Sequence, residues 1–142
     1  MLKTLLVCDD STGANASAIL LNKLRFKTLS AIDQKQLPDF SDYDALAVST
    51  DSRAVSPEIA YKRVRDVLKG FESEEIVVVN KRVDSTLRGN LGAELNAFYE
   101  VFKNRKIAIV PAFPKSGRTC INGQVYVNGV SLEKTDVAKD PK

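Results

Sequence analysis

Short apolar runs recur along the chain, and the stretches between them are long enough to hold helices. Each run is rich in β-branched or other apolar residues, as expected of a strand that is buried on both faces of a sheet. Strands that alternate with helices are joined by right-handed crossovers, so the sheet is mostly parallel and helices cover both of its faces. The sequence therefore predicts an α/β fold, with strands at residues 5–7, 28–31, 45–49, 76–80 and 107–110.

The helical segment at 57–69 is the most clearly marked. Ser56 suits the N-cap, Pro57 suits the first helical position, and Gly70 suits a left-handed C-cap. The apolar positions form one stripe, which consists of Ala60, Val64, Val67, Leu68 and Phe71. Because a helix with one apolar stripe packs that stripe against its neighbours, we expect these residues in the core.

Two other helical segments distribute their apolar residues differently. Leu91, Leu95, Phe98 and Phe102 are spaced by four, three and four residues, which places them on one helix face. The segment at 14–24 has apolar residues over much of its circumference. We therefore expect that first helix to be well buried.

The alternation of strands and helices ends after Val110. Residues 117–133 are predicted to form a loop and then a small C-terminal β-hairpin, in which Val125 and Val127 precede an Asn128–Gly129 turn. With 142 residues the chain is long enough for one domain and too short for two of ordinary size. We take residues 1–142 as a single domain.

Composition excludes several classes of function. The net charge of +3 is spread along the chain and no apolar run reaches membrane-spanning length, so we expect neither a nucleic acid nor a membrane as partner. The absence of histidine excludes Ser/His/Asp catalysis and histidine-based metal sites. Cys8 and Cys120 fit no metal or redox spacing, which is consistent with a reducing cytoplasm. We expect no metal site.

Polar residues follow four of the predicted strands. The carboxyl ends of parallel strands share one edge of the sheet, which is where ligands bind in this class of fold. The densest polar segment is 81–90, which combines cations, an acid and hydroxyl groups just before a predicted helix. The candidates for a binding site at this edge are Asp9, Asp10, Arg53, Lys81, Asp84, Ser85, Arg88, Gly89, Asn90 and Arg118.

Each of these loops also has a purely structural interpretation. Asp10 could cap the first helix, and Asp51 and Arg53 could form a surface ion pair. Residues 81–90 could be a polar connection. We favour a binding site because polar segments after four strands coincide at one edge, and polar groups concentrate at functional sites.

The residue types at this edge indicate the chemistry of the ligand. Arg53, Lys81 and Arg88 can neutralise a carboxylate or a phosphate, whereas the aspartates can accept hydrogen bonds from hydroxyl groups. A site with both kinds of group suits a small polyhydroxy acid. Arg88 is expected to be the main anion contact because it lies beside Gly89 and near a predicted helix N-terminus. No complete glycine-rich cradle for the phosphates of ATP occurs in the sequence.

The strings DDSTGA, TDSR, KRVDSTLRGNLGAE and PAFPKSGRT and the closing DP, in this order and spacing, resemble the four-carbon acid sugar kinase family. The resemblance covers nearly the whole chain. It implies ATP-dependent phosphorylation of a sugar acid such as threonate or erythronate, with an N-terminal substrate domain and a C-terminal nucleotide domain.

The same resemblance implies a division of labour. ATP and Mg²⁺ would bind mainly to the nucleotide domain, which is missing from these 142 residues, so that no cofactor and no kinase activity are expected of this chain alone. Asp9, Asp10 and Asp84 are the candidates for receiving the proton of the substrate hydroxyl or for orienting it.

Two other interpretations stay open. Asp51 could be the phosphoacceptor of a signalling domain like a response-regulator receiver, with Asp9, Asp10 and Lys81 around a Mg²⁺ ion. Alternatively, the chain could be an inactive, truncated binding or scaffold domain. A domain truncated before its nucleotide partner should also expose apolar surface and self-associate as a homo-oligomer. This surface is expected near the hairpin, at Val125, Tyr126, Val127 and Val130.

Overall fold

The computed structural model describes residues 2–139. Its first part alternates strands and helices in the order β1 (Thr4–Cys8), α1 (Ser11–Lys23), β2 (Thr28–Ala31), β3 (Ala45–Ser49), α2 (Pro57–Lys69), β4 (Val78–Arg82) and α3 (Leu91–Val101). A long connection then leads to the 3-10 turn η1 (Pro114–Ser116) and to β5 (Arg118–Ile121), β6 (Gln124–Val127) and β7 (Val130–Ser131). The 3-10 turns η2 (Leu132–Lys134) and η3 (Asp136–Lys139) follow. Asp140 and Pro141, the closing DP of the family resemblance, lie outside the described residues.

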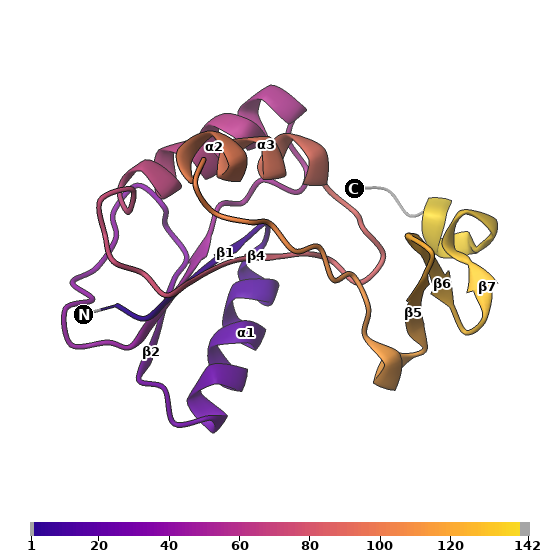
Figure 1. The fold of residues 1–142 in the computed structure, drawn as a ribbon, viewed down its shortest axis with the longest axis horizontal. Helices are drawn as coiled ribbons and strands as arrows, with labels where there is room; N and C mark the ends of the chain where they lie inside the picture. The colour runs from indigo at the N-terminus through magenta and orange to yellow at the C-terminus, as the bar shows by residue number, and fades with distance from the viewer. Residues whose placement is uncertain (1, 140–142) are drawn as a thin grey trace.

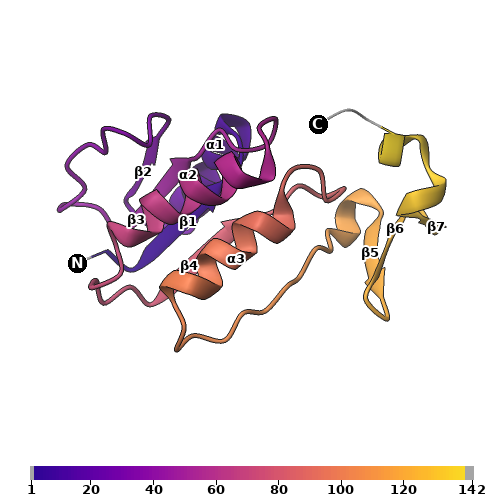
Figure 2. The ribbon, with the colours of Figure 1, turned by 90° about the horizontal axis from the view of Figure 1, so that it is seen from above.

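The main sheet has the strand order β2-β3-β1-β4, and each pair of neighbouring strands is parallel. Helix α1 covers one face of this sheet, and α2 and α3 lie side by side over the other (Figures 1 and 2). The predicted α/β class is confirmed. The strands at 28–31 and 45–49 match their predicted bounds, and β4 begins two residues later than predicted.

Most of the core lies between the sheet and the layer formed by α2 and α3. The predicted stripe of α2 is confirmed, since Ala60, Val64, Val67, Leu68 and Phe71 are all buried. The start of α2 is also as predicted, because Ser56 Oγ accepts a hydrogen bond from the backbone N–H of Ile59. The left-handed C-cap is wrong: Gly70 has φ of −63°, in the right-handed helical region. A further turn follows the helix, and Phe71 in this turn is buried in the core.

Helix α1 is less buried than its composition predicts. Only Gly13, Ala14 and Ala18 are buried, whereas Ile19 and Leu20 are exposed. The reason is the small size of the core on this face, where α1 rests on the sheet through a narrow stripe of small side chains. Of the larger apolar residues of the helix, Leu21 packs against this small core, whereas Ile19 and Leu20 are exposed.

Residues 107–110 do not form the predicted fifth strand. They have no place in the ladder of the main sheet, and Ile107, Ile109 and Val110 are exposed. An apolar run favours a strand only where a neighbouring strand supplies hydrogen bonds, and residues 102–112 run beside β4 without that pairing (Figure 2). Strand β4 is therefore an edge strand, and Val78 on it is exposed.

A groove of about 640 Å³ lies between β4, α3 and the segment at 105–110. The residues of α3 and its end that line this groove are Leu91, Leu95, Phe98 and Phe102. They share one face, as predicted. However, the fully buried face of α3 is a neighbouring one, which consists of Glu94, Ala97, Phe98 and Val101. The predicted apolar stripe is thus only partly covered in this structure.

The C-terminal part is a three-stranded antiparallel sheet in the order β5-β6-β7, rather than the single hairpin predicted. The predicted turn at Asn128–Gly129 is present, and Asn122 and Gly123 form a second turn of the same kind, with positive φ at both residues. Val125 and Val127 are buried within this sheet, so the expectation of exposure there is wrong for both, although Val130 is exposed.

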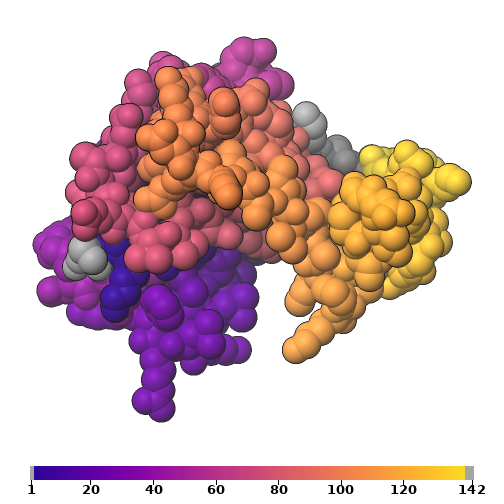
Figure 3. Space-filling model, in the orientation of Figure 1, coloured from indigo at the N-terminus to yellow at the C-terminus, as the bar shows by residue number. Residues whose placement is uncertain are grey.

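The small sheet stands apart from the main body in the space-filling view, and an open hollow separates it from α1 (Figure 3). Within residues 2–139, no helix is long and apolar enough to cross a membrane.

Candidate functional site

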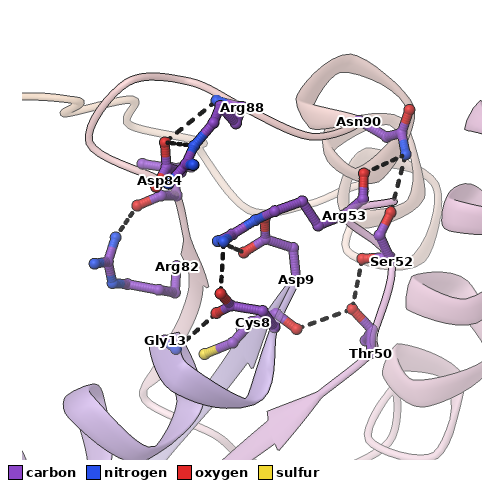
Figure 4. Close-up of polar contacts among 12 residues, drawn as sticks. Cys8, Asp9, Gly13, Thr50, Ser52, Arg53, Arg82, Asp84, Arg88 and Asn90 are labelled. Carbon is purple, nitrogen blue, oxygen red and sulfur yellow. Dashed lines mark hydrogen bonds and ion pairs between the residues drawn. The ribbon is translucent and has the colours of Figure 1, made fainter. Parts of the chain in front are cut away.

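Polar side chains from β1, β3, β4 and the loop before α3 converge at the carboxyl edge of the main sheet (Figure 4). Asp9 follows β1, Arg53 follows β3, and Lys81 lies near the end of β4. Parallel pairing of β1 with both neighbours brings these strand ends together. The edge position predicted for these residues is therefore where the structure places them.

Asp9 and Arg53 form the centre of this network. The Asp9 carboxylate is almost fully buried and takes two contacts from Arg53, from Nε to Oδ2 at 2.8 Å and from Nη2 to Oδ1 at 3.2 Å. The third nitrogen of Arg53, Nη1, lies 2.6 Å from Oδ2 of Asp10. Burial lowers the pKa of Arg53, but the hydrogen bond that Arg53 donates to Asp9 and the charges of the nearby acids outweigh it and raise the pKa above its usual value. The Arg53 guanidinium is thus held charged and in a fixed orientation.

Lys81 is buried in the same network. Its Nζ lies 2.9 Å from Oε2 of Glu94 and 4.0 Å from Oδ1 of Asp9, and it donates to the backbone carbonyl of Arg82 at 2.8 Å. The other carboxylate oxygen of Glu94 accepts a hydrogen bond from the hydroxyl of Ser52. Lys81 therefore links the ends of β1 and β4 to the first turn of α3.

Glu94 is a residue of this network that was not among the predicted site residues. It is 2% exposed and lies on the fully buried face of α3. A charged residue in an otherwise apolar helix face is a signal that the sequence does contain, because buried carboxylates need a partner. The apolar stripe chosen from the sequence was shifted around the helix and left this position out.

The loop between β4 and α3 is ordered by Asp84. Its Oδ2 accepts hydrogen bonds from the backbone N–H and the hydroxyl of Thr86 and from Nε of Arg88 at 3.0 Å, and its Oδ1 accepts from Nη2 of Arg88 at 3.0 Å. Burial raises the pKa of Asp84, but the hydrogen bonds from Arg88 and Thr86 outweigh it and hold the pKa well below its usual range. In this structure, the fork of Arg88 is directed at Asp84.

Gly89 lets this loop lie against the central ion pair. Its φ is 96°, which favours glycine, and a Cβ added there would lie 3.1 Å from Oδ2 of Asp9 and 3.6 Å from Cγ of Arg53. The next residue, Asn90, donates from its side-chain amide to the backbone carbonyls of Ser52 at 2.9 Å and Val55 at 2.8 Å. Together they tie the loop after β3 to the start of α3.

The remaining predicted residues lie around this network. Asp10 caps α1 by accepting a hydrogen bond from the backbone N–H of Gly13 at 2.6 Å, so its structural interpretation and its place at the edge both hold. Ser85 is half-buried and borders a cavity of about 300 Å³. Arg118 lies on β5, where it donates to the backbone carbonyl of Ser116, and within residues 2–139 it makes no hydrogen bond or ion pair with the network at the sheet edge.

Asp51 does not face this network. Its carboxylate is 88% exposed and pairs with Arg63 on α2 at 3.1 Å, and not with Arg53. A phosphoacceptor site would need Asp51 to face the acids after β1, so this geometry argues against the receiver-like interpretation. In the described part of the chain, no group of three or more acidic or thiol side chains is placed to hold a metal ion.

Comparison with known proteins identifies a family that this chain matches and several similar proteins. Residues 4–142 match the family described as a sugar-binding N-terminal domain. The chain is 41% identical over 145 residues to a D-erythronate kinase from Heliobacterium modesticaldum, covering 100% of this chain and 33% of the relative. It is 35% identical over 142 residues to a D-threonate kinase from Salmonella typhimurium, covering 99% of this chain and 33% of the relative. The chain thus spans about a third of the length of these relatives.

The fold is also found in a solved structure. A protein from Bordetella bronchiseptica, described as a domain of unknown function with bound citrate and as a domain-swapped dimer, superimposes with a TM-score of 0.89 at 32% identity. The match covers 99% of this chain and 37% of that protein.

Proposed function

Because the chain belongs to the family of sugar-binding N-terminal domains, we propose that it is the substrate-binding part of an ATP-dependent kinase that phosphorylates a four-carbon sugar acid of the erythronate or threonate type. The similarity to relatives named as D-erythronate and D-threonate kinases supports this substrate class. The observation that carries the proposal is the convergence of acids and cations from separate loops at the carboxyl edge of the sheet. Such an edge presents charged groups in fixed positions beside which a small polar ligand can bind.

Within this proposal, Asp10 is the acid best placed to meet a substrate hydroxyl. Its side chain is 26% exposed, whereas Asp9 is 3% and Asp84 is 12% exposed. Asp9 and Asp84 are each engaged by the fork of an arginine, so they serve to orient Arg53 and Arg88 beside the substrate. Catalysis of phosphoryl transfer is mainly positioning and charge stabilisation, and a carboxylate beside the attacking hydroxyl supplies the first of these.

The other predicted residues have supporting roles in this proposal. Lys81 adds positive charge beneath the site, and Ser85 offers a hydroxyl from the loop after β4. Gly89 and Asn90 fix the path of that loop. Arg118 would take part only if the small C-terminal sheet moved toward the sheet edge.

ATP and Mg²⁺ are assigned in this proposal to the part of the relatives that the chain does not span. The sequence lacks a phosphate cradle of the P-loop type, which supports this division. We expect the 142-residue chain to release no more ADP than a blank when it is incubated with ATP, Mg²⁺ and four-carbon sugar acids in the cytoplasmic pH range. Release that depends on the sugar acid would contradict the division of labour.

Binding of the substrate alone is the direct test of the proposed function. Calorimetric titration of erythronate and threonate into the chain should detect binding without ATP. Asp10→Asn should weaken it about tenfold or more, because Asn keeps the cap of α1 but loses the charge. Asp33→Asn, at an exposed loop position, is the matched control and should bind like the unmodified chain.

The outcomes of this titration separate the interpretations. If the unmodified chain binds none of the acids, the proposed function is wrong and the inactive scaffold interpretation gains support. If the acids bind but Asp10→Asn binds equally well, the substrate class stands and the role of Asp10 is wrong.

We also propose that the chain self-associates, and that the open side of β4 is the surface involved. The exposed residues Val78, Ile109 and Val110 lie along this side, beside the partly covered groove. An edge strand with unpaired backbone groups next to apolar side chains favours association with another chain.

A further inference from the structure

Three of the four cations of the predicted site are already paired with carboxylates of the chain itself. The fourth, Arg118 on β5, makes no hydrogen bond or ion pair with the network at the sheet edge within residues 2–139. Arg53 contacts Asp9 and Asp10, Lys81 contacts Glu94, and Arg88 contacts Asp84. A substrate carboxylate would have to displace one of these partners to bind there. Displacement would leave a buried or half-buried acid without its partner, which is costly. The carboxylate of a sugar acid therefore needs a cation outside these pairs.

Arg82 is such a cation, and it was not among the residues predicted for the site. The contact found for its guanidinium within residues 2–139 is with the backbone carbonyl of Val83. A backbone carbonyl cannot neutralise the charge, so the guanidinium can still form a charge-assisted pair with an anion. Arg82 ends β4, directly after Lys81.

The position of Arg82 suits a small ligand at the sheet edge. Its side chain lies between the loop that carries Asp84 and the start of α1 (Figure 4). A Cβ added at Gly13 would lie 3.5 Å from Cγ of Arg82 and 2.7 Å from Oδ1 of Asp10, so these two side chains border the same point above the first turn of α1. Arg82 and Asp10 therefore lie close to each other beside the start of α1.

A cavity also borders Arg82, but Asp10 and Gly13 are not among the residues that line it. Arg82 and Ser85 border the cavity of about 300 Å³, together with Leu20 of α1 and Phe113 of the connection after α3. It adjoins α1, which flanks the open hollow seen in Figure 3. The cavity thus combines a cation and a hydroxyl group with an entrance from solvent.

We infer that Arg82 binds the carboxylate of the sugar acid and so selects acids over neutral sugars, while Asp10 and Ser85 face the hydroxyl groups. This inference rests on the proposed function, because it concerns the same substrate class. It assigns to Arg82 the anion contact that the sequence pattern suggested for Arg88.

The experiment compares acids with neutral polyols of the same length. Erythronate, threonate, erythritol and threitol are titrated calorimetrically into the 142-residue chain and into Arg82→Gln, Arg82→Lys and Arg25→Gln. Arg25, exposed just beyond the far end of α1, is the matched control, since its substitution removes the same charge away from the site. Circular dichroism and thermal unfolding show that each variant is folded.

Arg82→Gln should bind the acids about tenfold to a hundredfold more weakly and should lose the preference for acids over polyols. Arg82→Lys should recover part of the affinity, because the charge returns without the planar fork. Arg25→Gln should behave like the unmodified chain. The inference is wrong if Arg82→Gln keeps the preference for acids, or if it loses affinity for acids and polyols equally.

Failure of the inference differs from failure of the proposed function. If the unmodified chain binds acids and Arg82→Gln binds them equally well, only the assignment of Arg82 is overturned. If the unmodified chain binds no acid, the proposed function and this contact are overturned together.

Discussion

The carboxyl edge of the main sheet and the open side of β4 are neighbouring regions that differ in how far their side chains are paired or covered within this chain. At the edge, buried acids and cations are paired across β1, β3, β4 and α3. Along the side of β4, apolar residues of a strand, a helix and a connection border a groove that nothing in residues 2–139 fills. The comparison indicates that contacts within this chain hold the polar side chains of the edge in place. The apolar groove, in contrast, needs a further protein surface to bury its side chains.

The largest effect should come from breaking the buried pair at the edge. Glu94→Ala leaves the Lys81 ammonium, 5% exposed, without its nearest acid, and should lower the free energy of unfolding by about 3 to 5 kcal/mol. Urea unfolding followed by circular dichroism measures this. Glu75→Ala, at an exposed position, should change it by no more than about 0.5 kcal/mol.

A double variant sharpens this test. Lys81→Met combined with Glu94→Leu removes both charges and should recover much of the stability, because apolar groups of similar size can replace a buried ion pair. If Glu94→Ala is as stable as the unmodified chain, the pair is not buried as described and the edge is not a preorganised site.

A smaller effect is expected at the Asp84–Arg88 pair, and it should depend on pH. The pKa of Asp84 is lowered in the folded state, so the pair stabilises the fold above the unfolded value of about 4 and loses this contribution as pH falls below it. Asp84→Asn should therefore lower the free energy of unfolding by about 1 to 3 kcal/mol at pH 7. The difference from the unmodified chain should shrink in acid.

Unfolding curves recorded from pH 7 down to about 3 follow this change. Asp42→Asn, at an exposed loop position, is the control for a general effect of removing an acid. A stability difference at Asp84 that is the same at all these pH values would show that the carboxylate does not carry the effect.

The two regions also differ in how well the sequence predicts them. Helix α2 was predicted at both bounds, because its cap, its proline and its apolar stripe are local signals. The edge position of Asp9, Arg53 and Lys81 followed from the parallel topology alone. Which acid pairs with which cation could not be predicted, because Arg53 meets Asp9 across more than forty residues of chain, and Glu94 pairs with Lys81 from a separate element.

The failures have physical causes as well. Residues 107–110 carry the pattern of a strand, but a strand forms only when a partner strand supplies its ladder, and the pattern says nothing about the partner. The first helix was expected to be buried because apolar residues were counted around it, yet the residues of this helix that are buried in the core on that face are small, and Ile19 and Leu20 are exposed. Both wrong predictions, the strand at 107–110 and the buried first helix, depend on the neighbouring elements. The residues of a segment do not specify which elements will pack against it.

The last prediction concerns the open side of β4 and has almost no expected effect on stability. Val78 on β4 is 48% exposed and Val130 on β7 is 47% exposed, so the two valines are matched in exposure but lie in different regions. If the β4 side is the surface of self-association, Val78→Lys should shift the chain toward monomer, because a lysine on an edge strand opposes pairing with a second chain. Val130→Lys adds the same charge to the small sheet and should leave the association unchanged.

Sedimentation velocity over a range of chain concentrations measures both variants, and thermal unfolding should show that each stays within about 0.5 kcal/mol of the unmodified chain. The opposite result, in which Val130→Lys dissociates the chain and Val78→Lys does not, would move the interface to the small sheet, where the sequence first suggested it. A chain that is monomeric at every concentration would show that the groove stays exposed without a second chain to cover it. The proposed difference between the internally paired sheet edge and the exposed side of β4 would then be wrong.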